Sequence, residues 1–316
     1  MLQNFLFSIS VSMPIFILLI VGWVLKKRNV VDEHFFSSAN KLIFQVALPA
    51  KLFLDTATSD FKKALDWRFI FFAVLCTTII FIGGWILGSL ILKDPSKVGA
   101  FAHGAFRGNY VYIGFALMQN ILGQNTIPAS APLVGAFVLP LYNIYAVIVL
   151  TVTNHPGSRI DFKSIFISII KNPMILGIAA GLLFALLEIP LPFVFTKSLE
   201  YLGDIATPLA LLSIGASIQF ASIKKDLKPI LIACFYKLVL QPAVVVPLAM
   251  KAGFQSEQIL VLFVLFGVPS AANVYIVTKS MGGDAQMGAG IIVVSILLST
   301  ITLTFGIFLL KTLSII

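Results

Sequence analysis

Charged side chains are scarce in this sequence. Asp, Glu, Lys and Arg make up 11% of the 316 residues, and the mean hydropathy is +1.02; a soluble domain carries about 25% charged residues. Because water cannot solvate a surface with so little charge, the composition excludes a soluble globular protein and indicates a polytopic membrane protein. The net charge of +9 is therefore interpreted through the positions of Lys and Arg along the chain, and it does not indicate a nucleic-acid partner.

Motifs of catalysis are also missing. The sequence contains no Gly-x-Ser-x-Gly nucleophile motif, no His-Glu-x-x-His zinc motif and no Walker A phosphate loop. Met281-Gly282-Gly283-Asp284 is half of the pattern of an intramembrane aspartyl protease, but no partner acid lies deep in another apolar segment. We therefore expect neither an enzyme nor a bound metal or cofactor, and any energy that the protein uses must come from a gradient or a partner.

Cysteine is nearly absent. Cys76 and Cys234 both fall inside apolar segments, so buried thiols are expected in place of a disulfide. A small-residue cleavage site is missing after the first apolar segment, 5–25, which is followed by Lys26-Lys27-Arg28. We expect this segment to be a retained membrane span, not a cleaved signal peptide.

Long apolar segments are abundant. Each is close to the ~20 residues that a helix needs to cross a bilayer, and the connections between them are short. The ten segments are 5–25, 35–57, 67–92, 97–123, 130–153, 164–188, 195–220, 229–250, 256–282 and 285–310. This pattern predicts an all-α membrane protein of ten transmembrane helices.

Lys and Arg are distributed unequally among the connections. Connections after odd-numbered segments carry twelve, whereas those after even-numbered segments, together with the C-terminus, carry six. Because cytoplasmic loops are enriched in Lys and Arg, the odd-numbered connections are predicted to be cytoplasmic. Both termini are then on the outer side of the membrane.

The two halves of the sequence resemble each other. Ala-Leu-Pro-Ala-Lys-Leu (47–52) is matched by Ala-Thr-Pro-Leu-Ala-Leu (206–211), with the prolines 159 residues apart. Val-Tyr-Ile occurs at 111–113 and again at 274–276, 163 residues apart. Since five segments per half is an odd number, the second half must enter the membrane in the opposite orientation. The sequence therefore predicts two inverted five-helix repeats, a common plan of secondary transporters.

The predicted domain boundaries follow from this repeat. Residues 1–153 form the first repeat and residues 164–316 the second. The link between them, 154–163, is short, polar and predicted to be cytoplasmic.

Two segments carry polar, helix-breaking residues in the middle. Segment 97–123 contains Arg107-Gly108-Asn109, and segment 256–282 contains Pro269 and Asn273. Such residues occur at mid-membrane depth where broken helices line a cavity. If the two breaks cross, helix N-termini and asparagine amides converge on a place that suits an anion. The alternative is that these residues only mediate helix packing.

Residues around the two breaks are the candidate substrate-binding residues. Arg107 is costly at this depth, by ~2.5–3.5 kcal/mol, and its planar guanidinium suits a carboxylate, although it can equally pair with a carbonyl freed by the break. The full candidate set is Lys51, Arg107, Gly108, Asn109, Tyr110, Pro269, Ser270 and Asn273.

A second set of residues is proposed for coupling or gating. Lys51 and Asp55 lie four residues apart on one helical face. They offer a titratable pair near the site or, alternatively, an internal salt bridge. Lys237 is another charge inside a segment. The candidates are Asp55, Lys237, Asn143, Pro49 and Pro208, and the two prolines are expected to kink their helices.

Five motifs in order resemble the auxin efflux carrier (AEC) family, bacterial permeases related to the plant PIN-type carriers. The motifs are Ala-Leu-Pro-Ala-Lys-Leu-Phe (47–53), Arg-Gly-Asn-Tyr-Val-Tyr-Ile-Gly (107–114), Lys-Asn-Pro-Met-Ile-Leu-Gly (171–177), Pro-Leu-Ala-Leu-Leu-Ser-Ile-Gly-Ala-Ser (208–217) and Pro-Ser-Ala-Ala-Asn (269–273). The match is spread over most of the chain. It departs from PIN-type carriers in its short central link, which implies that phosphorylation control through that link is absent.

The resemblance implies a fold similar to bile-acid sodium symporters and sodium/proton antiporters. The first, second, fifth, sixth, seventh and tenth helices would form a scaffold, and the third, fourth, eighth and ninth a transport domain. The family's crossover asparagines match Asn109 and Asn273. Family substrates are organic anions, auxin in plants and dicarboxylates such as malate or malonate in bacteria. Family relatives also suggest a homodimer through the scaffold, in the plasma membrane or the bacterial inner membrane.

The hypothesis from the sequence is a secondary carrier of a small carboxylate, such as malate, malonate or an auxin-like acid, working by alternating access. Its partners would be this anion, a coupling proton or sodium ion, and membrane lipid, with no nucleic acid. Three alternatives stay open: a sodium/proton-type exchanger, which needs an acid deeper than Asp55; a non-transporting membrane sensor of the same ligand; and an intramembrane enzyme.

Overall fold

The computed structural model describes residues 2–58, 66–122, 128, 130–154, 167 and 170–316. Within these ranges the chain is helical apart from short connections and one isolated β-bridge. The α-helices are α1 (Leu2–Lys27), α2 (Glu33–Leu42), α3 (Leu48–Ala57), α4 (Trp67–Ile91), α5 (Pro95–Phe106), α6 (Phe115–Leu122), α7 (Ser130–Thr153), α9 (Pro173–Leu186), α10 (Phe193–Asp204), α11 (Ala206–Ser217), α12 (Phe220–Lys225), α13 (Leu227–Phe235), α14 (Gln241–Lys251), α15 (Ser256–Gly267), α16 (Asn273–Ser280) and α17 (Ala285–Thr312). Most of the predicted link, 154–163, lies outside the described residues.

Helix starts follow from capping residues in the sequence. Asp66 accepts a hydrogen bond from the Phe69 amide at the start of α4, and Asp284 accepts one from the Met287 amide at the start of α17. Short polar side chains at this position satisfy amide groups that the first helical turn leaves without a partner. At α9, Asn172 is the cap and Pro173 is the first helical residue. Proline has no amide hydrogen, and at this position the helix needs none, because the first turn has no carbonyl to accept it.

Two helical runs contain a π-helical turn that ends two residues before a proline. Ile43–Ala47 joins α2 to α3 ahead of Pro49, and Tyr236–Leu240 joins α13 to α14 ahead of Pro242. A proline ring clashes with the carbonyl four residues earlier, and that carbonyl lies inside the wider π-helical turn in both runs. The prolines therefore change the local winding, as expected for Pro49, but the runs remain continuous.

The run that contains Pro208 is divided. Helix α10 ends at Asp204, four residues before Pro208, and α11 begins at Ala206. Because Pro208 cannot donate to the Asp204 carbonyl, the regular hydrogen-bond pattern fails here. The regular α-helix is thus interrupted at Ile205, whose backbone angles stay in the right-handed helical region.

Four helical segments of the described chain are long and apolar enough to cross a membrane: α4, α7, the run Leu227–Lys251 and α17. Helix α4 also has an exposed stripe of large apolar side chains at helical spacing, namely Phe71, Leu75, Ile79, Ile82 and Ile86. A surface of this kind is compatible with lipid and not with water. The protein is therefore an integral membrane protein of the all-α class.

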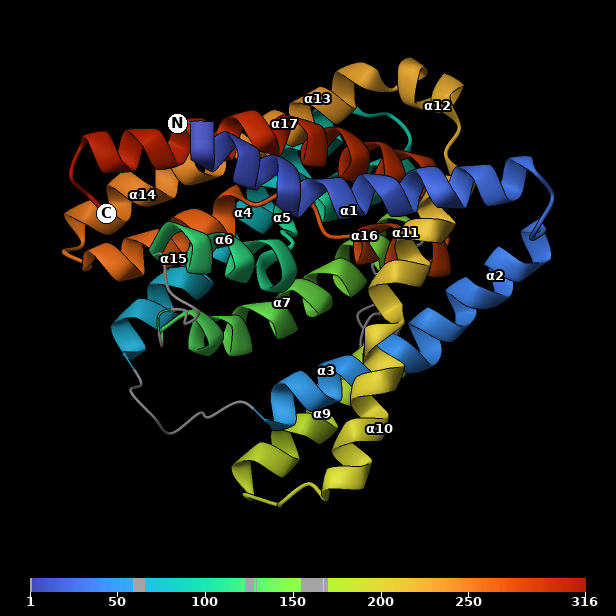
Figure 1. The fold of residues 1–316 in the computed structure, drawn as a ribbon, viewed down its shortest axis with the longest axis horizontal. Coiled ribbons are helices and arrows are strands. Elements are labelled where there is room, and N and C mark those ends of the chain that lie inside the picture. The colour runs from blue at the N-terminus through green and yellow to red at the C-terminus, as the bar shows by residue number, and fades with distance from the viewer. Residues whose placement is uncertain (1, 59–65, 123–127, 129, 155–166, 168–169) are drawn as a thin grey trace.

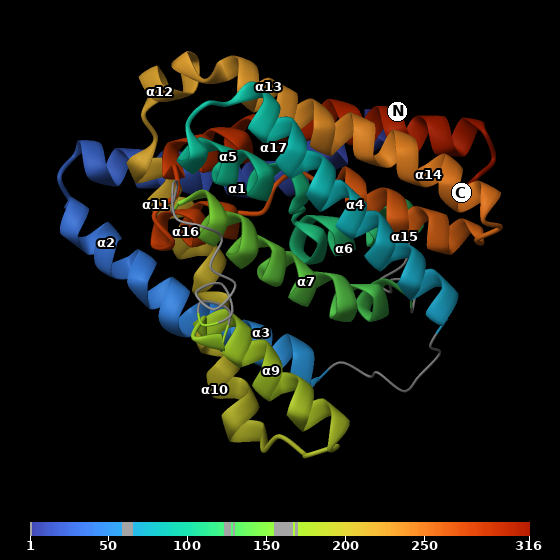
Figure 2. The same ribbon diagram turned by 180° about the vertical axis from the view of Figure 1, so that it is seen from behind.

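Two helix pairs pack backbone to backbone through glycine. In the α1–α11 pair, Gly22 lies against the carbonyl of Leu212, and Gly215 lies against the carbonyl of Leu19. In the α3–α9 pair, Gly177 and Gly181 lie against the α3 backbone. Small residues permit such close approach between membrane helices. Figures 1 and 2 both show α3, α9 and α10 grouped at the lower edge, with α13, α14 and α17 at the opposite edge and α7 between the two groups.

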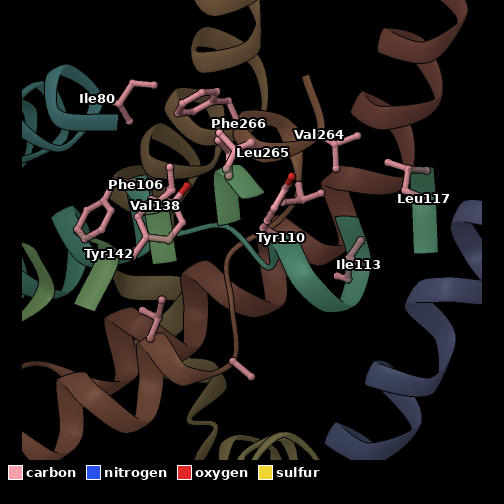
Figure 3. Close-up of a cluster of buried hydrophobic side chains, with 14 of the residues drawn as sticks. Ile80, Phe106, Tyr110, Ile113, Leu117, Val138, Tyr142, Val264, Leu265 and Phe266 are labelled. Atoms are coloured by element: carbon pink, nitrogen blue, oxygen red, sulfur yellow. The ribbon is translucent and has the colours of Figure 1, made fainter. Parts of the chain in front are cut away.

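The core lies around α5 and α15. Every residue of α5 from Val98 to Phe106 and of α15 from Ile259 to Gly267 is buried. Figure 3 shows Tyr110 and Tyr142 among apolar side chains that include Phe106 and Leu265. The two helices that stop in mid-course are thus the most deeply enclosed, which places their broken ends inside the protein.

Candidate functional site

The two helix interruptions meet in space. Gly108 and Ser270 form an isolated antiparallel bridge. The backbone N–H of Asn109 donates to the Pro269 carbonyl at 2.8 Å, and the backbone N–H of Ala271 donates to the Arg107 carbonyl at 3.4 Å. Backbone groups freed by each break are therefore satisfied by the other break, as a buried non-helical segment requires.

Carbonyl groups at the ends of α5 and α15 are satisfied by side chains. The Ser270 hydroxyl donates to the Gly104 carbonyl at 2.6 Å, and the side-chain amide of Gln241 donates to the Ala105 carbonyl at 2.6 Å. Lys237 donates to the Phe266 carbonyl at 3.2 Å. The last carbonyls of a helix have no partner within it, so these three side chains hold both broken ends in place.

Lys237 lies behind the crossing, out of the cavity. It is fully buried, and its ammonium group also donates to the Gln241 side-chain oxygen at 3.2 Å. A positive charge at the carboxyl end of a helix is favourable because it meets the negative end of the helix dipole. A Cβ atom on Gly108 would lie 3.0 Å from the Lys237 Nζ atom, so the ammonium group directly supports the crossing.

Arg107 is held by α7. It is 3% exposed, and its guanidinium donates to the Asn143 Oδ1 atom at 2.8 Å. Asn143 in turn donates to the Leu139 carbonyl at 2.9 Å, which fixes the amide in this orientation. Tyr110, three residues further along the chain, donates from its hydroxyl to the Ala131 carbonyl at 3.0 Å. Helix α7 therefore orients both side chains that flank Asn109.

A cavity of about 80 Å³ opens at the crossing. Among the candidates from the sequence, Lys51, Asp55, Arg107, Gly108, Asn109, Tyr110 and Asn273 line it. Apolar and small residues complete the lining: Ile43, Leu48, Leu52, Val111, Leu139, Ala206, Thr207, Ala210, Ala271, Ala272 and Ile276. Helices α3, α11 and α16 thus face the same space as the break after α5.

Lys51 and Asp55 form a salt bridge at 3.5 Å. Both residues line the central cavity and also a second cavity of about 250 Å³, which Glu200 and Asp204 line as well. The pair therefore stands between the two spaces. An ion moving from one space to the other would pass beside it.

The remaining candidates surround the cavity without lining it. Pro269 and Ser270 form the crossing itself, Asn143 and Lys237 lie behind it, and Pro49 packs against Gly177. Pro208 lies next to Thr207, which does line the cavity. Thr207 and Gln241 were not predicted from the sequence as site residues. Each lies directly before a proline, and this position in a helix was the one feature that could have indicated them.

No group of three or more His, Cys, Asp or Glu side chains in the described part of the chain is arranged to hold a metal ion. The His103 imidazole is fully buried, with its Nδ1 atom 3.3 Å from the Thr278 hydroxyl. The side chains that donate hydrogen bonds at the crossing belong to Ser270, Gln241, Lys237 and Arg107, and such donors are suited to an anion.

Known transport proteins are similar to this chain over most of its length. The family model described as membrane transport protein matches residues 7–163 and 158–307. An uncharacterized transporter of Methanocaldococcus jannaschii is 25% identical over 301 residues, covering 92% of this chain and 94% of the relative. A putative malonate transporter of Rhizobium meliloti is 25% identical over 308 residues, covering 95% and 94%. An uncharacterized transporter of Escherichia coli K12 is 20% identical over 298 residues, covering 92% and 94%.

Proposed function

The chain belongs to the membrane transport protein family, the auxin efflux carriers that its motifs resemble, and on that premise we propose that it carries a small organic anion across the membrane by alternating access. The observation that carries the proposal is the cavity at the crossing, where Asn109, Asn273, Arg107 and Lys51 line one space. These four side chains supply hydrogen-bond donors and two positive charges, which together match a carboxylate.

The helix ends at the cavity add to this preference for an anion. Helix α16 begins at Asn273, and the helical turn after the first break begins at Tyr110, so both start with residues that line the cavity. Amide groups and the positive end of the dipole at a helix start favour negative charge. Among the described residues of the lining, Asp55 is the one acid, and it already pairs with Lys51.

The size of the cavity favours a small substrate. Sites for drug-sized ligands occupy about 300–1,000 Å³, whereas this cavity has about 80 Å³. The relative from Rhizobium meliloti is named a putative malonate transporter. We therefore propose a short dicarboxylate such as malonate, with one carboxylate at Asn109 and Asn273 and the other toward Lys51.

Two inverted five-helix repeats are proposed as the framework, with both termini on the outer side. The glycine-mediated pairs support this plan. Helices α1 and α11 belong to the first and seventh predicted segments, and the equivalent segments of the other half are the sixth and the second. These contain α9 and α3, which form the other glycine-mediated pair. The transport domain, built from the third, fourth, eighth and ninth segments, would move against the remaining scaffold. A homodimer through the scaffold belongs to the same proposal.

Uptake of radiolabelled malonate, malate and an auxin-like acid into proteoliposomes tests the function. We expect saturable malonate uptake that is lost in Asn109→Ala and in Asn273→Ala. Imposed pH and sodium gradients, applied separately, identify the coupling ion.

The matched control is Asn120→Ala, because Asn120 is an exposed asparagine of α6, which follows the same break. It should transport like the wild type. Equal uptake by all four proteins would contradict the assigned site. Saturable malonate binding without uptake would favour a sensor.

A further inference from the structure

Three buried polar side chains outside the cavity have no hydrogen-bond partner in the described structure. Tyr142 lies in α7 beside Phe106. The other two are Asn40 of α2, both of whose amide atoms are unpaired, and Ser213 of α11, whose hydroxyl is unpaired. Asn40 is 4% exposed and Ser213 is 0% exposed. Leaving a buried donor or acceptor unsatisfied costs about 1–3 kcal/mol per group, so their presence requires an explanation.

Both residues belong to helix faces that continue from the cavity. Asn40 lies three residues before Ile43, and Ser213 lies three residues after Ala210; Ile43 and Ala210 line the cavity. Residues three apart share one face of a helix. Asn273, which lines the cavity, also has an unpaired buried side-chain oxygen.

The helices that carry these residues meet one another. α2 contacts α11, and α16 contacts both. Figures 1 and 2 both show α2, α11 and α16 side by side at one flank of the molecule. Asn40, Ser213 and Asn273 therefore lie along a common seam, which we call the α2–α11–α16 seam.

The seam leaves the cavity at the end opposite to the Lys51–Asp55 pair. Along the run 33–57, the order is Asn40, then Ile43, then Lys51 and Asp55. Along α10 and α11, the order is Asp204, then the cavity-lining Ala210, then Ser213. In both runs the cavity separates the unpaired polar residue from the acid that lines the second cavity.

We propose that the α2–α11–α16 seam is the second half of the substrate path, closed in this structure and opened in the alternate state of the carrier. When it opens, water or the substrate carboxylate pairs with Asn40 and Ser213, which lowers the free energy of the open state relative to the closed one. The proposal rests on the transport function proposed above. It adds Asn40 and Ser213 as a polar subsite for the anion on the cytoplasmic side of the crossing.

Thiol accessibility tests the seam. Asn40→Cys and Ser213→Cys are introduced separately into a chain with Cys76→Ala and Cys234→Ala, since these are the two native cysteines and both are buried. A membrane-impermeant, positively charged methanethiosulfonate reagent is applied to either face of oriented vesicles. We expect both thiols to react from the cytoplasmic face, at a rate that saturating malonate changes severalfold.

Ser299→Cys in α17 is the matched control, because Ser299 is equally buried and its hydroxyl is bonded to the Ile296 carbonyl. It should stay unreactive. If Asn40→Cys and Ser213→Cys react no faster than Ser299→Cys while the parent chain takes up malonate, the seam is wrong and the carrier function stands. If both react but malonate is not taken up, the seam is supported and the substrate assignment fails.

Ser213→Ala keeps the test informative if a cysteine variant does not fold. It removes a hydroxyl that has no hydrogen-bond partner among the described residues, so thermal stability in detergent should not fall. We expect malonate uptake to slow severalfold. Uptake at the wild-type rate in this variant would count against the subsite.

Discussion

Gly108 is the position where the crossing has least room. A Cβ atom there would lie 2.9 Å from a methyl group of Val268, 3.0 Å from the Lys237 Nζ atom and 3.2 Å from the Leu265 carbonyl oxygen. The absence of a side chain therefore allows the two breaks to form their bridge and allows the buried ammonium group to reach both. Gly108 therefore leaves room for the Lys237 ammonium group, which holds the Phe266 carbonyl at the end of α15.

Gly108→Ala is expected to reduce malonate uptake by at least tenfold and to lower thermal stability. Extra volume in a packed interior costs about 1–3 kcal/mol, and here it also displaces the ammonium group that holds the Phe266 carbonyl. Uptake into proteoliposomes and thermal unfolding in detergent measure the two effects.

Gly267→Ala is the control for that substitution. Gly267 ends α15 at the same crossing, but the nearest atom to its Cβ would be 3.6 Å away, which is ordinary contact. It should behave like the wild type. If Gly108→Ala were equally silent, the bridge between the breaks would not be needed for transport.

Individual helices are joined at two glycine-mediated contacts that have the same chemistry. In each pair, glycine of one helix lies against backbone carbonyls of the other, so the interhelical distance is set by the missing side chain. In the lipid environment such packing, and not the hydrophobic effect, holds helices together. These pairs should therefore contribute a large share of the scaffold's stability.

Gly215→Ala and Gly181→Ala should each destabilise the protein by about 1–3 kcal/mol. At Gly215 the new methyl group would overlap the Leu19 carbonyl, and at Gly181 it would lie 2.5 Å from the Phe53 carbonyl oxygen. Thermal unfolding in detergent, followed by loss of monodisperse protein, measures the change. Gly288→Ala, whose nearest neighbour is at 3.7 Å, should leave stability unchanged, and equal stability of all three variants would refute the importance of these contacts.

Across the whole molecule, Lys51 and Asp55 line both the cavity at the crossing and the second, larger cavity. At neutral pH the Asp55 carboxylate offsets the charge of Lys51 at 3.5 Å. As the pH falls and Asp55 takes up a proton, this offset disappears and the field of Lys51 acts on the substrate. Anion binding is therefore expected to tighten on acidification, which would link substrate entry to a proton.

Asp55→Asn is expected to bind malonate about tenfold more tightly than the wild type in mildly alkaline buffer, the equivalent of about 1.4 kcal/mol. In mildly acidic buffer the variant and the wild type should bind malonate almost equally. The malonate affinity of the variant should therefore depend less on pH than that of the wild type. Isothermal titration in detergent checks this. Asp32→Asn is the control, because asparagine also caps a helix and Asp32 caps α2 at an exposed position. An unchanged pH profile in Asp55→Asn would exclude Asp55 as the coupling group.

The class of the protein and the position of both helix breaks could be predicted from the residues alone. Low charge and long apolar segments require lipid around the chain, and Arg107-Gly108-Asn109 and Pro269 are incompatible with a continuous lipid-facing helix. The structure interrupts α5 and α15 at these places. Local chemistry was sufficient here because a helix break depends on nearby residues.

Which side chains line the same cavity depends on how the helices pack and could not be predicted from the residues alone. Ser270 was predicted to bind the substrate, and the structure shows its hydroxyl donating to the Gly104 carbonyl of another helix. Thr207 and Ala210 line the cavity because α11 packs beside the crossing, and Lys237 lies behind it. Such contacts join residues far apart in the sequence, and they depend on which helix faces meet, which the spacing of residues along one segment does not specify.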